Sequence, residues 1–272
     1  MRVSLALRPA YSAGMIRSAL VAVLLYLASP MAVPGAAATE MDYTLYVLGI
    51  PVADAVLGFD LAPASYRASL RYHTTGLASV VAGNRLEMHT RGVFDGERPI
   101  PREFTSTGTL RGQDRVVGLA WRDGTPIVTA LAPPNDAERE DVPALQRART
   151  IDPLSTLVEL LRLTARTGRC EGAIPTYDGR RLELFQAHAA GEEDLPPSGR
   201  SSFSGHVLRC DFIDRTLAGF RLGADHDDDS KERRGTVWLA QVVSGLPRLP
   251  VRASVDMRWL GKAMIYLTSL AP

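Results

Sequence analysis

Cysteine, lysine and asparagine are scarce in this sequence. Cys170 and Cys210 are the only cysteines in 272 residues, and Lys231 and Lys262 are the only lysines, so arginine carries nearly all of the positive charge. There is no Cys-x-x-Cys pair and no zinc-helix histidine spacing, which argues against a metal centre. With 46% hydrophobic and 22% charged residues, the chain can still bury a real core. The scarcity of lysine and asparagine is typical of GC-rich bacterial coding sequence.

Long apolar runs are absent after residue 38. A transmembrane helix needs about twenty consecutive apolar residues, so we expect no transmembrane segment in the mature chain. The first 38 residues contain Arg2, Arg8 and Arg17 but no acid, then a short apolar run and Ala36-Ala37-Ala38. This order predicts a cleaved signal peptide over 1–38, the alternative being an uncleaved anchor. We therefore expect a single β-rich envelope domain over 39–272, exported to the periplasm.

Familiar catalytic and cofactor motifs are also missing. The sequence contains no nucleophile elbow, no Ser-x-x-Lys, no P-loop and no dinucleotide fingerprint, so we expect no cofactor. Without the three arginines of the first 38 residues, 28 of the 31 bases remain against 30 acids. A slightly negative chain with dispersed arginines and no aromatic ladder argues against nucleic-acid binding.

The dominant period along the mature chain is two. Residues 66–73 alternate apolar and polar side chains, residues 251–259 do the same through Trp259, and weaker versions recur along the chain. Each of these strands therefore has one apolar face and one solvent-exposed face, a pattern that favours an antiparallel sheet. About a dozen short strands cannot form one flat sheet, so we predict a mainly β fold curled into a single barrel-like, half-barrel or spiral sheet.

One amphipathic helix is predicted at about 153–167. Asp152 suits the cap position and Pro153 the first helical turn, and Gly168 follows the last turn. Leu154, Val158 and neighbouring leucines fall on one face, which should pack inside the curled sheet or at its open end. Loops are expected at 131–150, 190–202 and 224–234.

The two cysteines enclose about forty residues, and an isolated pair in an exported protein favours a disulfide. Closing a loop of this length contributes roughly 4 kcal/mol on the chain-entropy model. A metal or redox role and free thiols are the alternatives.

The turn after Cys170 contains a concentrated group of charged residues, with the order Tyr177-Asp178-Gly179-Arg180-Arg181. Asp-Gly between two strand-like runs favours a tight hairpin, because the turn needs residues that tolerate positive φ. The functional alternative is a catalytic Asp178 beside phosphate-binding Arg180 and Arg181.

Two further polar groups match known sites less well. Asp225, Asp227 and Asp229 have the initial spacing of a calcium loop, but the glycine and glutamate that complete it are replaced by Ser230 and Thr236. We therefore expect a solvated loop. His73 and His89 lie on polar strand faces, where they could approach each other or Glu87, although such histidines are usually only hydrated.

The order of several short motifs resembles a family, the exported bacterial proteins grouped as domain-of-unknown-function family 3108. The shared motifs are Gly49-Ile50-Pro51-Val52, Ile151-Asp152-Pro153-Leu154-Ser155, Cys170, the 177–181 turn, Cys210, Gly219-Phe220, Val237-Trp238-Leu239-Ala240 and Pro250-Val251-Arg252. Leu182-Glu183 stands where the family commonly has Tyr-Asp. The resemblance covers about 42–270 and implies a curled β-sheet in the cell envelope and the disulfide, but no activity.

Three hypotheses follow for function. The first is a non-enzymatic periplasmic protein whose curled sheet binds a lipid-like ligand or an envelope protein. The second is an enzyme that modifies envelope glycan or lipid, with Asp178 or Asp54 acting beside Arg180. The third is a purely structural assembly partner.

Overall fold

The structure, a computed structural model, describes residues 38–81, 83–257 and 260–271. These residues form one sheet of thirteen strands, each antiparallel to its neighbours. The strands are β1 (Thr39–Val47), β2 (Ile50–Leu61), β3 (Ser65–Thr74), β4 (Arg85–Asp95), β5 (Arg98–Leu110), β6 (Gln113–Arg122), β7 (Thr125–Ala132), β8 (Gly172–Tyr177), β9 (Leu182–Leu195), β10 (Gly205–Ala218), β11 (Arg233–Ala240), β12 (Leu249–Met257) and β13 (Gly261–Ala271).

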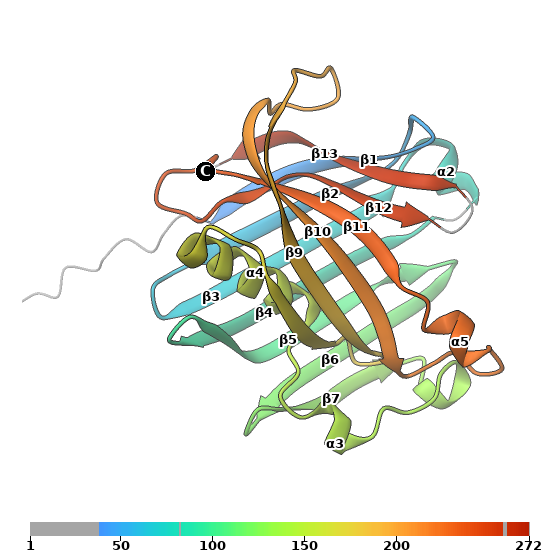
Figure 1. Ribbon diagram of the computed structural model, residues 1–272. Helices are drawn as coiled ribbons and strands as arrows, with labels where there is room; N and C mark the ends of the chain where they lie inside the picture. The colour runs from blue at the N-terminus through green and yellow to red at the C-terminus, as the bar shows by residue number, and fades with distance from the viewer. Residues whose placement is uncertain (1–37, 82, 258–259, 272) are drawn as a thin grey trace, which may run out of the picture. The chain divides into compact units, whose positions relative to one another are not determined.

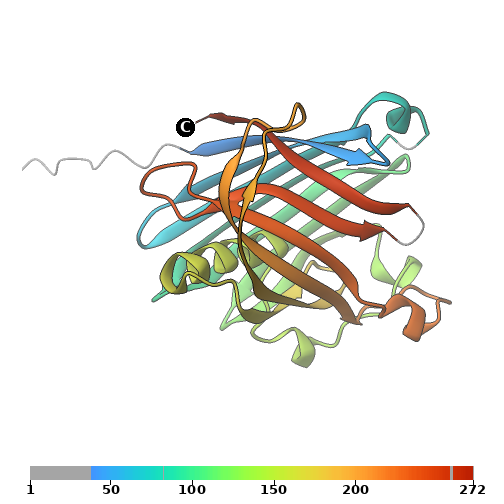
Figure 2. The same ribbon diagram turned by 45° about the horizontal axis from the view of Figure 1, so that its top comes forward.

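The sheet curls into a nearly closed barrel, which confirms the predicted fold class. Its strand order is β7-β6-β5-β4-β3-β2-β1-β13-β12-β11-β10-β9-β8. The chain therefore starts in the middle of the sheet, steps outward to the β7 edge, crosses to the β8 edge and steps back until β13 pairs with β1. Figures 1 and 2 show the two halves facing each other, with a helix between them at one end.

That helix is α4 (Pro153–Thr167), and it matches the predicted position. Gly168 ends it in the left-handed region at φ 70°, where its N–H donates to the Thr164 carbonyl. Val158 and Leu161 are fully buried, and α4 packs against β3, β4, β5 and β8. The apolar stripe thus lies inside the curled sheet.

Several elements differ from the sequence-based prediction. Short helices α2 (Gly76–Val81), α3 (Ala144–Arg147) and α5 (His226–Asp229) and a 3-10 turn at Asn135–Ala137 accompany α4. Strand β8 is the run that the predicted hairpin placed before Asp178, although no bounds were predicted for it, and β9 extends to Leu195, through residues expected to form a loop. The strand pattern at 251–259 reaches Met257, whereas Trp259 and the predicted signal peptide lie outside the described residues.

Asp152 fixes the start of α4 to the sheet. Its Oδ1 accepts the N–H groups of Leu154 and Ser155 at 3.0 and 2.9 Å. Its Oδ2 accepts the hydroxyl of Ser155 at 2.5 Å and that of Thr90, on β4, at 2.9 Å. The Ser155 hydroxyl also lies 2.7 Å from the Tyr66 hydroxyl on β3. A fully buried carboxyl therefore joins the helix cap to two strands.

The same burial explains the titration of this group. Loss of hydration raises the pKa of Asp152, although the hydrogen bonds from Ser155 and Thr90 oppose that shift. Burial likewise raises the pKa of the Tyr66 hydroxyl well above its usual range. Because both groups are inaccessible to solvent, we interpret this cluster as structural.

Replacing Asp152 by alanine should lower the free energy of unfolding by about 3 kcal/mol, because two helix N–H groups and two buried hydroxyls lose their acceptor. Urea denaturation followed by circular dichroism measures the change. Asp136→Ala, in the 3-10 turn, serves as the control and should leave the midpoint unchanged. Equal midpoints for the two variants would contradict the proposed anchoring role.

Candidate functional site

The charged turn predicted from the sequence connects β8 to β9 through residues 178–181. Asp178 Oδ1 accepts the backbone N–H groups of Arg180 and Arg181 at 2.8 and 2.6 Å. Gly179 has φ +93°, and a Cβ added there would lie 2.3 Å from Cγ1 of Val117 on β6. Glycine is therefore required on two grounds, the left-handed backbone and the close approach of β6.

Arg180 joins the two edges of the sheet. Its Nη2 donates to the carbonyls of Ala132 and Pro133, at the end of β7, with both distances 2.8 Å. Its Nη1 lies 3.5 Å from the carboxylate of Glu138, which also binds Arg115 of β6. The Arg180 side chain is mostly buried. Its positive charge therefore contacts protein groups at the β7 edge and not solvent, and these contacts close the barrel.

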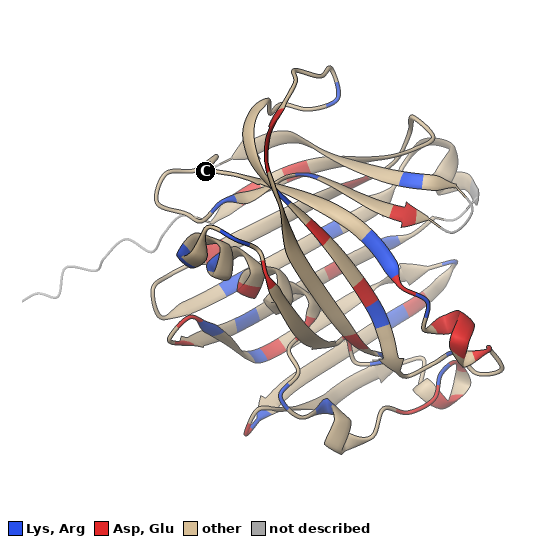
Figure 3. Cartoon of the chain, in the orientation of Figure 1, with Lys and Arg blue, Asp and Glu red and all other residues tan. Residues whose placement is uncertain are grey.

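Arg181 lies at the centre of a second group of charges, part of the charged region on β9, β10 and β11 in Figure 3. Its guanidinium binds Asp178 Oδ2 at 2.8 Å and Glu183 Oε1 at 2.9 Å. Arg233 of β11 pairs with the same Glu183 and with Asp214 of β10. The result is an alternating chain of acids and bases across three neighbouring strands.

The pKa shifts follow from this pairing. Burial acts to raise the pKa of Asp178, but Arg181 and the two turn N–H groups outweigh it, so the pKa lies below its usual value. Burial raises the pKa of Glu183. The carboxylate of Asp178 raises the pKa of Arg181 above its usual range. The ionised forms of Asp178 and Arg181 stabilise each other.

This geometry does not assemble the catalytic group of the enzyme hypothesis. The Asp178 carboxylate and both arginine side chains bind other protein groups. Asp54, the alternative acid, lies on the outer face of β2, where it accepts a hydrogen bond from Thr44 at 2.8 Å. The structure therefore does not bring Asp54 and Arg180 together.

Replacing Arg181 by alanine should destabilise the protein by about 2–3 kcal/mol, because Asp178 and Glu183 would lose a shared, largely buried counter-charge. Thermal unfolding at neutral pH measures the effect. The control, Arg169→Ala, removes an exposed arginine paired with Glu171, and surface pairs contribute little. An Arg181 variant as stable as this control would contradict the structural role.

The cysteines form a disulfide in the structure. Cys170 and Cys210 have Cα atoms 6.0 Å apart and are separated by 40 residues in the sequence. Both are fully buried. Cys170 directly precedes the edge strand β8 and Cys210 lies on β10, so the bond ties the β8 edge across β9 to the interior of the sheet.

Reducing this disulfide should lower the free energy of unfolding by about 4 kcal/mol on the chain-entropy model. Melting curves recorded with and without a thiol reductant measure the shift. A Cys170→Ala/Cys210→Ala double variant is the control and should melt at one temperature in both buffers. An unchanged melting temperature for the reduced wild-type protein would contradict this contribution.

The acidic segment and the histidines do not form a metal site. Asp229 binds Arg221 at 2.8 Å, and Asp225 caps the short helix α5. His89 lies 2.9 Å from Glu87 on its own strand, whereas His73 pairs across the sheet with Arg85. Within the described ranges, no group of three or more histidine, cysteine or acidic side chains could hold a metal ion.

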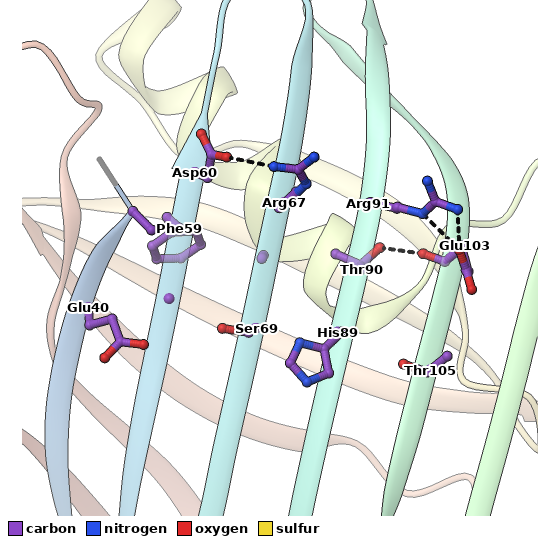
Figure 4. A pocket seen from close by; sticks show the side chains of 13 residues that line it. Glu40, Phe59, Asp60, Arg67, Ser69, His89, Thr90, Arg91, Glu103 and Thr105 are labelled. Carbon is purple, nitrogen blue, oxygen red and sulfur yellow. Dashed lines mark hydrogen bonds and ion pairs between the residues drawn. The ribbon is translucent and has the colours of Figure 1, made fainter. Parts of the chain in front are cut away.

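A polar groove of about 440 Å³ lies on the outer face of β1–β5. Gly58, Ser69 and Thr105 leave it hollow because they are small, and the pairs Asp60–Arg67 and Arg91–Glu103 flank it (Figure 4). These charges neutralise each other across short distances. We interpret the groove as the solvated outer face of the sheet.

The inner face of the sheet is more unusual, because many of its apolar side chains are only half-buried. They come from both halves, and we call this set the inner wall: Leu45, Leu70, Tyr72, Met88, Phe185, Phe212, Ala253 and Ile265. By contrast, Tyr66, Phe59 and Phe104, on the same face nearer α4, are fully buried. The interior is therefore packed at the helix end and less completely packed beyond it.

Local contacts hold the inner wall in place. The rings of Phe185 and Phe212 stack with centroids 5.3 Å apart. Gly235 of β11 makes room for Phe212, since an added Cβ would lie 2.4 Å from the ring. Burial raises the pKa of the Tyr72 hydroxyl, which is consistent with apolar surroundings. The alternating sequence pattern indicates which residues face inward but not that some stay half-exposed.

Comparisons with known proteins agree with the fold. The family model described as "Protein of unknown function (DUF3108)" matches residues 42–268. A crystal structure of a β-barrel-like protein of domain of unknown function DUF1849 from Brucella abortus aligns with a TM-score of 0.52 and 14% identity, over 86% of this chain and 96% of that chain. That likeness shows the fold alone. None of the curated proteins matches the sequence.

Proposed function

We propose a function for this chain, which belongs to the DUF3108 family of proteins of unknown function. It is an exported, non-enzymatic protein of the cell envelope, and it holds a lipid-like ligand against its inner wall. The observation that carries the proposal is the partial exposure of the inner wall beside a helix end whose apolar side chains are fully buried. Binding sites favour concave, mostly apolar surfaces with few polar groups.

Two features support export to an oxidising compartment. The first 38 residues have the basic, apolar and small-residue order of a signal peptide. The buried Cys170–Cys210 pair is a disulfide, a bond that persists in oxidising environments such as the periplasm. In the described part of the chain, no helix has the length and apolar character needed to cross a membrane.

The chemistry of the inner wall favours an acyl chain over a polar ligand. Its members are aliphatic or aromatic, and Tyr72 carries their one polar side-chain group. The acids Glu183 and Asp214, on the same face beside Phe185 and Phe212, are already paired with Arg181 and Arg233. Burying a side chain of this kind against hydrocarbon contributes about 1.5–3 kcal/mol. The outer groove has charges that already pair with each other, so it offers less to a lipid.

Tyr72→Glu should abolish lipid binding, because a carboxylate on the inner wall is costly to bury against an acyl chain. The protein would be purified without detergent from a periplasmic extract, its lipids identified by mass spectrometry, and its affinity for N-phenyl-1-naphthylamine measured by fluorescence. We expect at least a tenfold loss of affinity, about 1.4 kcal/mol.

The matched control is His73→Glu, which places the same side chain one residue further along β3, exposed on the outer face. It should bind the probe as the wild type does, and circular dichroism would verify the fold of both variants. A wild-type protein free of lipid and unable to bind the probe would sink the proposal. So would equal binding by the two variants.

A further inference from the structure

Three neighbouring turns at one end of the sheet expose large apolar side chains. They are the β1–β2 turn, the helix α2 that follows β3, and the β12–β13 turn. Because β3, β2, β1, β13 and β12 are consecutive antiparallel strands, these three connections lie at the same end. Figure 1 shows the β1–β2 turn beside α2 at the upper right, with the ends of β12 and β13 pointing toward the same side.

The exposure of these side chains is high. Leu48 and Ile50 are 72% and 60% exposed, Leu77 and Val80 are each 83% exposed, and Met257 and Leu260 are 37% and 44% exposed. We call these six residues the apolar tips. Single exposed hydrophobic residues are ordinary, but a group at adjacent turns marks an interaction site.

The charges around the apolar tips are mainly basic. Residues 48–52, 75–84 and 257–262 contain no aspartate or glutamate in the sequence. Arg85 and Arg200 are exposed beside them, and the Arg200 guanidinium reaches the carbonyl of Gly49. Lys262 lies 3.6 Å from Asp256.

This pattern is not shared by every turn at that end. The connection between β10 and β11 carries a run of acids that includes Asp227 and Asp228, and Asp228 pairs with Lys231. The β4–β5 turn at the opposite end carries Glu97, paired with Arg162 of α4. The apolar surface with few acids therefore covers the corner formed by β3, β2, β1, β13 and β12, and Leu110 of the β5–β6 turn, 43% exposed, borders it.

We propose that the apolar tips dock this end of the barrel onto a lipid bilayer with anionic headgroups. The tips are exposed on three separate turns with exposed arginines beside them, and apolar side chains flanked by basic ones are typical of surfaces that lie in the interface of an anionic bilayer. Arg85 and Arg200 supply attraction to the anionic headgroups. The inference goes beyond the proposed function, because it depends on the exposed turns and not on the inner wall.

The test uses the full mature chain and vesicles of phosphatidylethanolamine and phosphatidylglycerol, with binding measured by co-sedimentation. Leu77→Asp/Val80→Asp should weaken binding at least about tenfold, because two inserted side chains become charged. Both residues are so exposed that the fold should tolerate the change. The matched control is Leu145→Asp on α3, a position 93% exposed away from the tips, which should bind within about twofold of wild type. Raising the salt concentration should weaken binding by the wild-type protein.

Three outcomes would overturn the docking proposal. The first is a wild-type protein that does not sediment with vesicles, and the second is a double variant that sediments as well as wild type. Sedimentation velocity could instead reveal a wild-type dimer that Leu77→Asp/Val80→Asp converts to monomer, which would assign the tips to a second copy. Tyr72→Glu separates the two proposals, since it should lose the fluorescent probe and keep vesicle binding.

Discussion

The free edges of the sheet are the constraint on which the architecture depends. Thirteen antiparallel strands leave β7 and β8 each without a strand partner on one side, and unpaired backbone groups at such an edge are costly to bury. The β7–β8 connection and the β8–β9 turn share this task. Ile151 exchanges backbone hydrogen bonds with β8, Arg180 of the β8–β9 turn donates to the carbonyls at the end of β7, and α4 packs against β8 and against β3–β5.

The two faces of the sheet follow different physical rules. Outside, arginines and acids pair over short distances in water, where each pair adds little to stability. The exception is the group of Arg181, Glu183, Arg233 and Asp214, because Glu183 and Asp214 alternate with Phe185 and Phe212 on the inner face. Inside, packing is graded: the end at α4 is close-packed around the Asp152 cap, and the inner wall beyond it is not. The gradient arises because α4 covers the sheet interior at one end only. A curled sheet thereby gains both a rigid end and an apolar surface that stays accessible.

The sheet and α4 could both be predicted from the sequence, because the alternation of apolar and polar side chains and the Asp152-Pro153 cap are local signals. The hairpin at Asp178-Gly179 implied a strand before the turn, but the bounds of β8 were not predicted because the run is short and contains Pro175, a residue tolerated on edge strands such as this one. Residues 190–195 read as a loop by composition, yet pairing with β10 makes them strand. The charged turn was located as well, but its partners Asp214 and Arg233 come from distant strands, a relation that spacing cannot reveal.

The pairing of β1 with β13 has a consequence for folding. This ladder joins residues more than two hundred positions apart, such as Asp42 and Ser269, whereas nearly every other pairing joins consecutive strands. Loop closure of this length is slow, so chains with such contacts fold late and expose apolar surface meanwhile. The pairing of β1 with β13 cannot form until β13 is available. In an unfinished chain the inner wall therefore stays open to water until β13 pairs with β1.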